Sequence, residues 1–188
     1  MQPRTYLSII ALVSILGVAA LTEGAVAQSP NSAEARLKER NITLIESVAR
    51  SIGQSLEVAM ARNLDDLEPA FTQLVSAQVG AVLVSNDAFF LSQRVQLVAL
   101  AKRHSLPASY EWREFPAVGG LMSYGPSLPG TFQIVGTYAA NIIKGAQPSD
   151  LPIEQPTEFN LVINSATARS LGIHIPPTLL ARADEVIE

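Results

Sequence analysis

Hydrophobic and polar residues switch repeatedly between helical and extended spacing along the chain, which predicts helices that alternate with short strands. After residue 30, apolar side chains recur every three to four positions as far as Ile52. Asn31 is the expected cap of this helix, and Gly53 is its expected stop. Residues 56–60 alternate instead, as a half-buried strand should. The apolar face of that strand is predicted to consist of Leu56, Val58 and Met60.

A second helix is expected to begin late, near Asp66, because Pro69 fits only within a first turn. Its predicted apolar face consists of Leu67, Phe71, Leu74 and Val75. The continuous apolar run at 81–84 predicts a strand that is covered on both faces. One helix should follow as far as His104, with Leu91, Val95, Val98 and Lys102 in a row.

The second half of the chain continues this alternation. We expect, in order, a strand at 107–110, a loop or single helical turn at 111–120, a strand at 121–124 closed by a turn at Gly125-Pro126, a helix from Ser127 to Gly145, a stiff linker at 146–156, a strand at 159–163, a short helix capped by Asn164, and a last helical turn at Pro176-Pro177. Such an order indicates a parallel sheet in an α/β fold. Ligands of these sheets bind beyond the carboxyl ends of the strands.

The N-terminus has the anatomy of a secretory signal peptide. Arg4 precedes an apolar stretch over 6–21, and Ala25-Val26-Ala27 is typical of a cleavage site. We therefore expect a signal peptide over residues 1–27, with cleavage after Ala27 and a periplasmic mature protein. The uncharged run at 5–22 is also about long enough to span a membrane, so an uncleaved anchor is the alternative.

Composition excludes several classes of function. Of the 188 residues, 48% are hydrophobic and 16% charged, which suffices for a buried core. Thirteen basic and seventeen acidic residues give a net charge of −4, which argues against nucleic acid as a partner. The absence of cysteine and the presence of only two histidines argue against a metal centre. No phosphate-binding loop, dinucleotide fingerprint or G-x-S-x-G elbow occurs, so we expect no cofactor and no enzyme.

Several segments in order resemble a known family. They are NLDDLEPAF, FFLSQRVQLVALAKRHSLPASY, EFPAVGGLMSYGP, GAQPSDLPIEQPTEFNLVIN and LGIHIPPTLLARADEVIE. Together they resemble the substrate-binding proteins of ABC transporters, including tryptophan- and tyrosine-type periplasmic receptors. The resemblance covers residues 32–188.

The resemblance implies a two-lobed type I periplasmic-binding fold, of which this chain holds an incomplete second lobe. Residues 28–126 would form that α/β lobe, and residues 127–188 the crossover helix, linker and terminal strand–helix segment. The implied function is capture of a small amino-acid-like ligand, aromatic ones included, for an ABC permease. The alternative is a truncated remnant that binds nothing or serves as an interaction module. Without a first lobe, self-association or a separately encoded first lobe would have to cover the apolar residues Phe132, Val135, Ile142 and Ile143.

Side chains suited to ligand binding follow three of the predicted strands. The candidates are Asn86, Asp87, Tyr110, Glu111, Trp112, Ser123 and Tyr124. Asp87 could pair with an ammonium group, and rings beside Glu111 suit an aromatic or cationic ligand. Structural roles remain as alternatives: Asn86 or Asp87 as helix caps, residues 110–112 as a core anchor with a solvated glutamate, and Tyr124 packed beside a turn rather than at a hinge.

Overall fold

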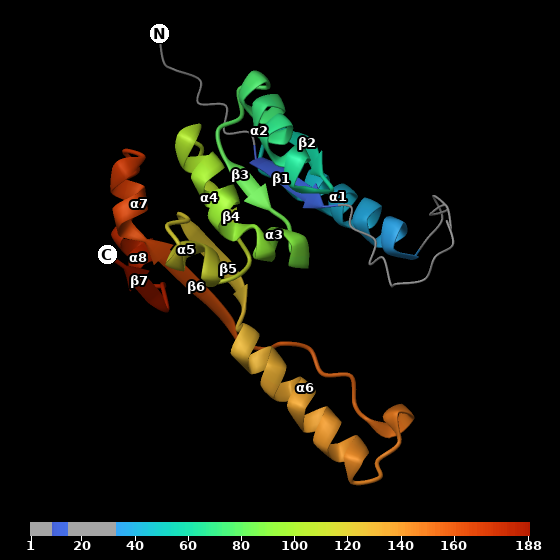
Figure 1. Cartoon of the computed structure of the whole chain (residues 1–188). Helices are drawn as coiled ribbons and strands as arrows, with labels where there is room; N and C mark the ends of the chain where they lie inside the picture. Colours follow the sequence, from blue (N-terminus) through green and yellow to red (C-terminus); the bar gives the residue numbers. More distant parts are fainter. Residues whose placement is uncertain (1–8, 15–32) are drawn as a thin grey trace. The chain divides into compact units, whose positions relative to one another are not determined.

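The computed structural model describes residues 9–14 and 33–188, which divide into two compact units (Figure 1). The first unit is Met1–Ser109 and the second is Tyr110–Glu188. The lobe boundary predicted after residue 126 stays a prediction. Asn31 and the predicted cleavage site at 25–27 lie outside the described residues.

A parallel sheet forms the centre of the first unit. Its strands are β1 (Ile9–Ser14), β2 (Leu56–Ala61), β3 (Val82–Val84) and β4 (Ala108–Tyr110), in the spatial order β2-β1-β3-β4. The last residue of β4, Tyr110, is the first residue of the second unit. The pairs β1–β2, β1–β3 and β3–β4 are all parallel, as the alternation of elements predicted. Strand β1 lies within the segment that the sequence assigns to a signal peptide, so this strand was not expected.

The helices of the first unit are α1 (Ala33–Ser51), α2 (Leu67–Ser76), α3 (Ala88–Ser92) and α4 (Arg94–Arg103), with a 3-10 turn η1 (Leu64–Asp66) before α2. The late start of α2 is confirmed, and the side chain of Asn63 caps η1 by accepting from the backbone N–H groups of Asp65 and Asp66. The single helix predicted up to His104 was wrong, because the structure divides it at Gln93.

Packing in the first unit follows the predicted faces only in part. Leu67, Phe71 and Leu74 of α2 are buried as expected. On β2, Ala59 and Ala61 are buried whereas Met60 is exposed, so the predicted inward face was wrong. Five of the six residues of this strand are apolar, and alternation alone therefore did not decide which face is buried. Several residues of the predicted apolar helix faces are exposed: Leu44, Val48 and Ile52 in and just after α1, Val75 in α2 and Val95 in α4.

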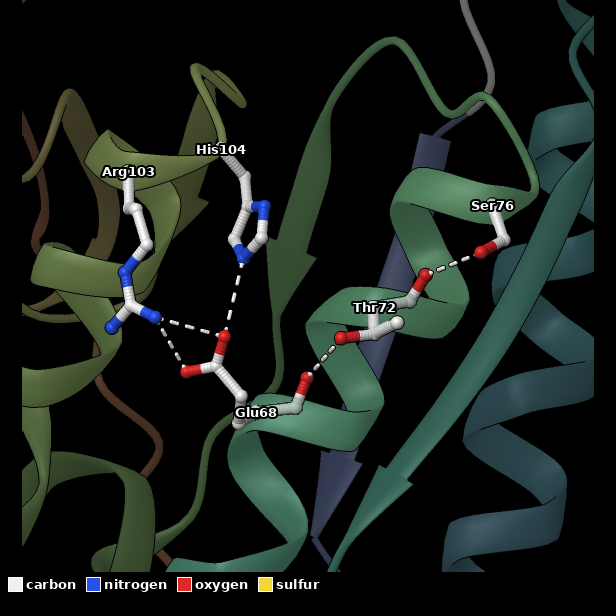
Figure 2. Close-up of polar contacts among 5 residues, drawn as sticks. All are labelled: Glu68, Thr72, Ser76, Arg103 and His104. Atoms are coloured by element: carbon white, nitrogen blue, oxygen red, sulfur yellow. Dashed lines mark hydrogen bonds and ion pairs between the residues drawn. The ribbon is translucent and has the colours of Figure 1, made fainter.

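Glu68 links α2 to the end of α4 (Figure 2). One nitrogen of Arg103, Nη1, donates to both carboxylate oxygens of Glu68 at 2.9 Å. Nε2 of His104 lies 3.6 Å from Oε1 of Glu68, and the histidine ring stacks on Phe71. His104 therefore has a structural environment at the helix end, as its sequence position indicated. The ion pair is exposed, so its contribution to stability is small, about 0–1 kcal/mol.

The second unit contains three further strands, β5 (Met122–Pro126), β6 (Phe159–Asn164) and β7 (Glu185–Ile187). Strands β5 and β6 are antiparallel, and β6 and β7 are parallel. The antiparallel pair departs from the all-parallel expectation, and β7 was not predicted. The helices are α5 (Glu114–Ala117), α6 (Leu128–Ile143), α7 (Ser165–Ser170) and α8 (Pro177–Leu180), with a 3-10 turn η2 (Pro148–Asp150).

The turn predicted at Gly125-Pro126 was wrong, because both residues continue β5. Gly125 pairs with Asn160, and Pro126 pairs with Phe159. The glycine instead permits a close approach: a Cβ atom at this position would lie 2.4 Å from the carbonyl oxygen of Glu111. Gly125 is thus required by packing against the loop after β4 and not by a reversal of the chain.

Ser127 caps the start of helix α6, because its Oγ accepts from the N–H of Gly130, and Gly145 follows the helix in a left-handed conformation. These ends confirm the prediction. None of its sixteen residues is buried. The hydroxyl of Tyr138 donates to the carbonyl of Pro152 and accepts from the N–H of Glu154, which ties the returning segment to the helix.

Within residues 9–14 and 33–188, no helix combines the length and apolarity needed to cross a membrane.

Candidate ligand-binding pocket

A pocket of about 310 Å³ lies within the second unit, between the loop after β4, the end of β5, the start of α6 and strand β6. Glu111, Arg113, Glu114, Ser123, Gly125, Pro126, Ser127, Leu128, Pro129, Asn160 and Val162 line it. The volume is within the range of small-molecule sites, about 300–1,000 Å³. The lining combines carboxylates, a guanidinium, hydroxyls and apolar side chains.

Alternation along β5 decides which side chains face this pocket. Ser123 and Gly125 line it, and Ser123 is buried. Tyr124 does not line the pocket, is 60% exposed, and stacks on Phe159 with ring centroids 5.8 Å apart. Successive side chains of a strand point to opposite faces, so Tyr124 lies on the face opposite to Ser123.

Arg113 carries the positive charge of the pocket wall and is already paired. Its Nε lies 2.6 Å from Oε2 of Glu185, and its Nη2 lies 2.7 Å from Oε1, a bidentate arrangement. The hydrogen bonds from Arg113 to Glu185 raise the pKa of the guanidinium, and the charges of Glu185 and of Glu114 add to this effect. Arg113 thus stays cationic, with two of its five N–H groups paired to Glu185.

Glu114 offers the clearest unmet interaction in the pocket. Its Oε2 atom is buried, yet it accepts no hydrogen bond within the described part of the chain. A buried acceptor without a donor is costly, and native structures satisfy nearly all such groups. A ligand donor such as an ammonium group would satisfy this oxygen once the carboxylate turns toward the cavity that Glu114 lines.

The start of α6 provides the complementary polarity. Ser127, Leu128 and Pro129 line the pocket at the N-terminal end of this sixteen-residue helix. The N-terminus of a helix carries a partial positive charge and favours anionic groups. A zwitterion with its ammonium at Glu114 and its carboxylate at α6 would match both features.

The predicted site residues divide between the two units and between roles. Glu111 and Ser123 line the pocket. Trp112, which follows Glu111 in the sequence, is half-buried. Tyr110 is 2% exposed, and its ring stacks on Phe115 with ring centroids 4.3 Å apart. Burial raises the pKa of the Tyr110 phenol, so it stays neutral.

The remaining two candidates belong to the first unit. Asn86 is exposed. Asp87 caps α3, since its Oδ1 accepts from the N–H of Phe89 at 2.8 Å. Capping does not decide whether Asp87 also contacts a ligand, and the ligand contacts of all seven residues stay predictions.

Four polar pocket residues were missed in the sequence: Arg113, Glu114, Ser127 and Asn160. Arg113 and Glu114 directly follow the predicted cluster at 110–112, so a wider window would have included them. Ser127 was interpreted only as a helix cap. Asn160 had no local signal, because the antiparallel register with Gly125 places it in the pocket.

No group of three or more histidine, aspartate or glutamate side chains among the described residues is arranged to hold a metal ion. His174, the second histidine, is exposed.

Comparison with known sequences matches a family model described as ABC transporter substrate binding protein to residues 25–187. A search of curated protein sequences found no significant match.

Solved structures share the fold. An ABC domain in complex with L-Trp from Streptococcus pneumoniae has a TM-score of 0.78 and 22% identity, and the match covers 96% of this chain and 55% of that one. A conserved domain protein from Vibrio cholerae O1 biovar El Tor has a TM-score of 0.77 and 22% identity, and the match covers 95% of this chain and 54% of that one. The ligand-free, open structure of a substrate-binding protein with adhesive properties from Clostridium difficile has a TM-score of 0.60 and 14% identity. This match covers 96% of this chain and 54% of that one. The chain thus spans about half the length of the solved structures it matches.

Proposed function

Because the chain belongs to the ABC transporter substrate-binding protein family, we propose that it captures a small amino-acid-like solute and presents it to an ABC permease. The family is one of solute-binding proteins, so the proposed action is binding without catalysis. The observation that carries the proposal is Glu114, which lines a pocket of about 310 Å³ and whose buried Oε2 has no hydrogen-bond partner among the described residues.

The charges around the pocket support a zwitterionic ligand. Glu114 and Glu111 place carboxylates in the wall, where an ammonium group gains charge-assisted hydrogen bonds. The N-terminal end of α6 is the complementary place for a carboxylate. Leu128, Pro129 and Val162 supply an apolar wall for a side chain.

An aromatic amino acid is the first ligand to test. The structure from Streptococcus pneumoniae was solved in complex with L-Trp. The match covers 55% of that chain, and L-Trp therefore enters here as the first member of a ligand panel.

Calorimetric titration of the full chain with L-tryptophan, L-tyrosine, L-phenylalanine and L-leucine tests the proposal. We expect at least one to bind and to raise the melting temperature. A ligand present at about 100 times its Kd adds about 2.7 kcal/mol to stability, or roughly 5–10 °C for a domain of this size. No heat and no thermal shift with any of the four, for a chain that melts cooperatively, would contradict the proposal.

Proteins of this family are typically periplasmic, and we propose that the N-terminal segment directs export of this one. The cut that the sequence predicts after Ala27 would, however, remove strand β1. The pairing of that strand supports a second role for the segment.

The exposed face of α6 favours association with another chain, either a second copy or a separately encoded lobe. Its apolar side chains Phe132, Val135, Ile142 and Ile143 are all exposed, the last by 86%. This feature would also remain in a remnant that serves only as an interaction module.

We expect the full chain to self-associate at tens of micromolar. The double substitution Phe132→Ser with Val135→Ser should shift light-scattering mass toward the monomer, because it removes apolar area from α6. Leu44→Ser with Val48→Ser, on the exposed face of α1, is the matched control. A monomeric parent chain would count against association through α6.

A further inference from the structure

Strand β1 occupies an interior position in the sheet of the first unit (Figure 1). It pairs with β2 along its whole length, from Ile9 opposite Leu56 to Ser14 opposite Ala61. On its other side, Ala11 and Leu12 lie opposite Leu83 and Val84 of β3. Residues 11 and 12 are thus paired with both neighbours.

Removing β1 would leave β2 and β3 without a strand between them. The facing edges of both strands would expose backbone N–H and C=O groups that the sheet now pairs. Buried backbone groups without partners are costly, and the gap is one full strand wide, about 4.8 Å on each side. The remaining strands therefore cannot form the same sheet by small shifts.

The sequence match and the structural match begin at different points near the N-terminus. The family model begins only at residue 25. The structural match to the Streptococcus pneumoniae domain covers 96% of the chain, which carries it upstream of that residue. The structural match thus extends into the N-terminal segment, whereas the match to the family's sequence pattern does not.

We propose that residues 9–14 are a structural strand of the folded protein, so that the first unit folds only in a chain that keeps them. The apolar N-terminal segment then serves as a strand of the folded protein, although its sequence is typical of a signal peptide. Cleavage after Ala27 and formation of this sheet exclude each other within one molecule.

Two proline substitutions in the full chain, expressed in the cytoplasm without export, separate the two roles. Leu12→Pro lies within β1, whereas Val18→Pro lies outside it in the same apolar run. A leader or anchor helix is broken by either proline, but the strand is broken only by the first. We expect Leu12→Pro to lower hydrogen-exchange protection of the β2 and β3 amides by about tenfold or more, and Val18→Pro to leave it unchanged.

Equal protection in both variants, whether high or low, would overturn the proposal. A second measurement covers the case in which Leu12→Pro fails to fold. The chain has no cysteine, so Ala11→Cys with Val58→Cys, which are register partners, should form a disulfide within one molecule on mild oxidation. The control pair Ile9→Cys with Ala61→Cys, at opposite ends of the paired strands, should not, and equal cross-linking of the two pairs would contradict the strand.

Discussion

Replacing Gly125 by alanine should destabilise the protein by about 3 kcal/mol, because overpacking in a well-packed region costs about 1–3 kcal/mol or more. The new Cβ would lie 2.4 Å from the carbonyl oxygen of Glu111 and 2.5 Å from its Cγ. The backbone atom cannot move without displacing the loop after β4. For a domain of this size the melting temperature should fall by about 6–12 °C.

Gly136→Ala is the matched control, because an added Cβ there meets no atom within 4 Å. Gly136 lies inside α6, where alanine is favoured over glycine by about 1 kcal/mol. The control should therefore melt at the parent temperature or slightly above it. If Gly125→Ala also melts at the parent temperature, the loop at Glu111 yields freely and the close approach is not a structural requirement.

The second large effect is expected on ligand affinity. Glu114→Gln should weaken binding of the best amino acid by about 10–100-fold, because a hydrogen bond to a charged group contributes about 1.5–3 kcal/mol. Glutamine keeps the size of the side chain and removes its charge. Calorimetric titration measures the change, and a thermal melt of the unliganded variant measures stability.

The two readouts distinguish a binding role from a structural one. Loss of a buried carboxylate without a hydrogen-bond donor should leave the stability of the free protein unchanged or higher. Glu154→Gln, on the exposed segment after α6, should change neither quantity. A Glu114→Gln variant that binds as tightly as the parent would remove Glu114 from the site.

Elements with their own end signals were predictable from the sequence. Ser127 caps α6 and Asn164 caps α7, each through its side-chain oxygen. The left-handed glycine Gly145 follows α6, as its position suggested. These signals are local, so they depend on no distant partner.

Features fixed by distant partners were not predictable in this way. Strand β7 has three residues, and it is held in place by Asp184, which accepts from the N–H of Leu161 at 2.7 Å and donates its own N–H to the carbonyl of Leu161. That pairing spans twenty-three positions of sequence. The same holds for the pocket, where Glu111 and Ser123 follow from strand ends but Asn160 enters through the antiparallel register.

Trp112 is the single tryptophan of the chain, and it lies in the loop that carries Glu111 and Arg113. Intrinsic emission excited at the red edge therefore originates from one unit, whereas far-ultraviolet ellipticity sums the helices and strands of both. Comparing the two signals during unfolding therefore shows whether the two units unfold one after the other. Loss of ellipticity ahead of the emission shift would mean that the first unit melts while the second persists, and coincident curves would mean that the two units unfold as one.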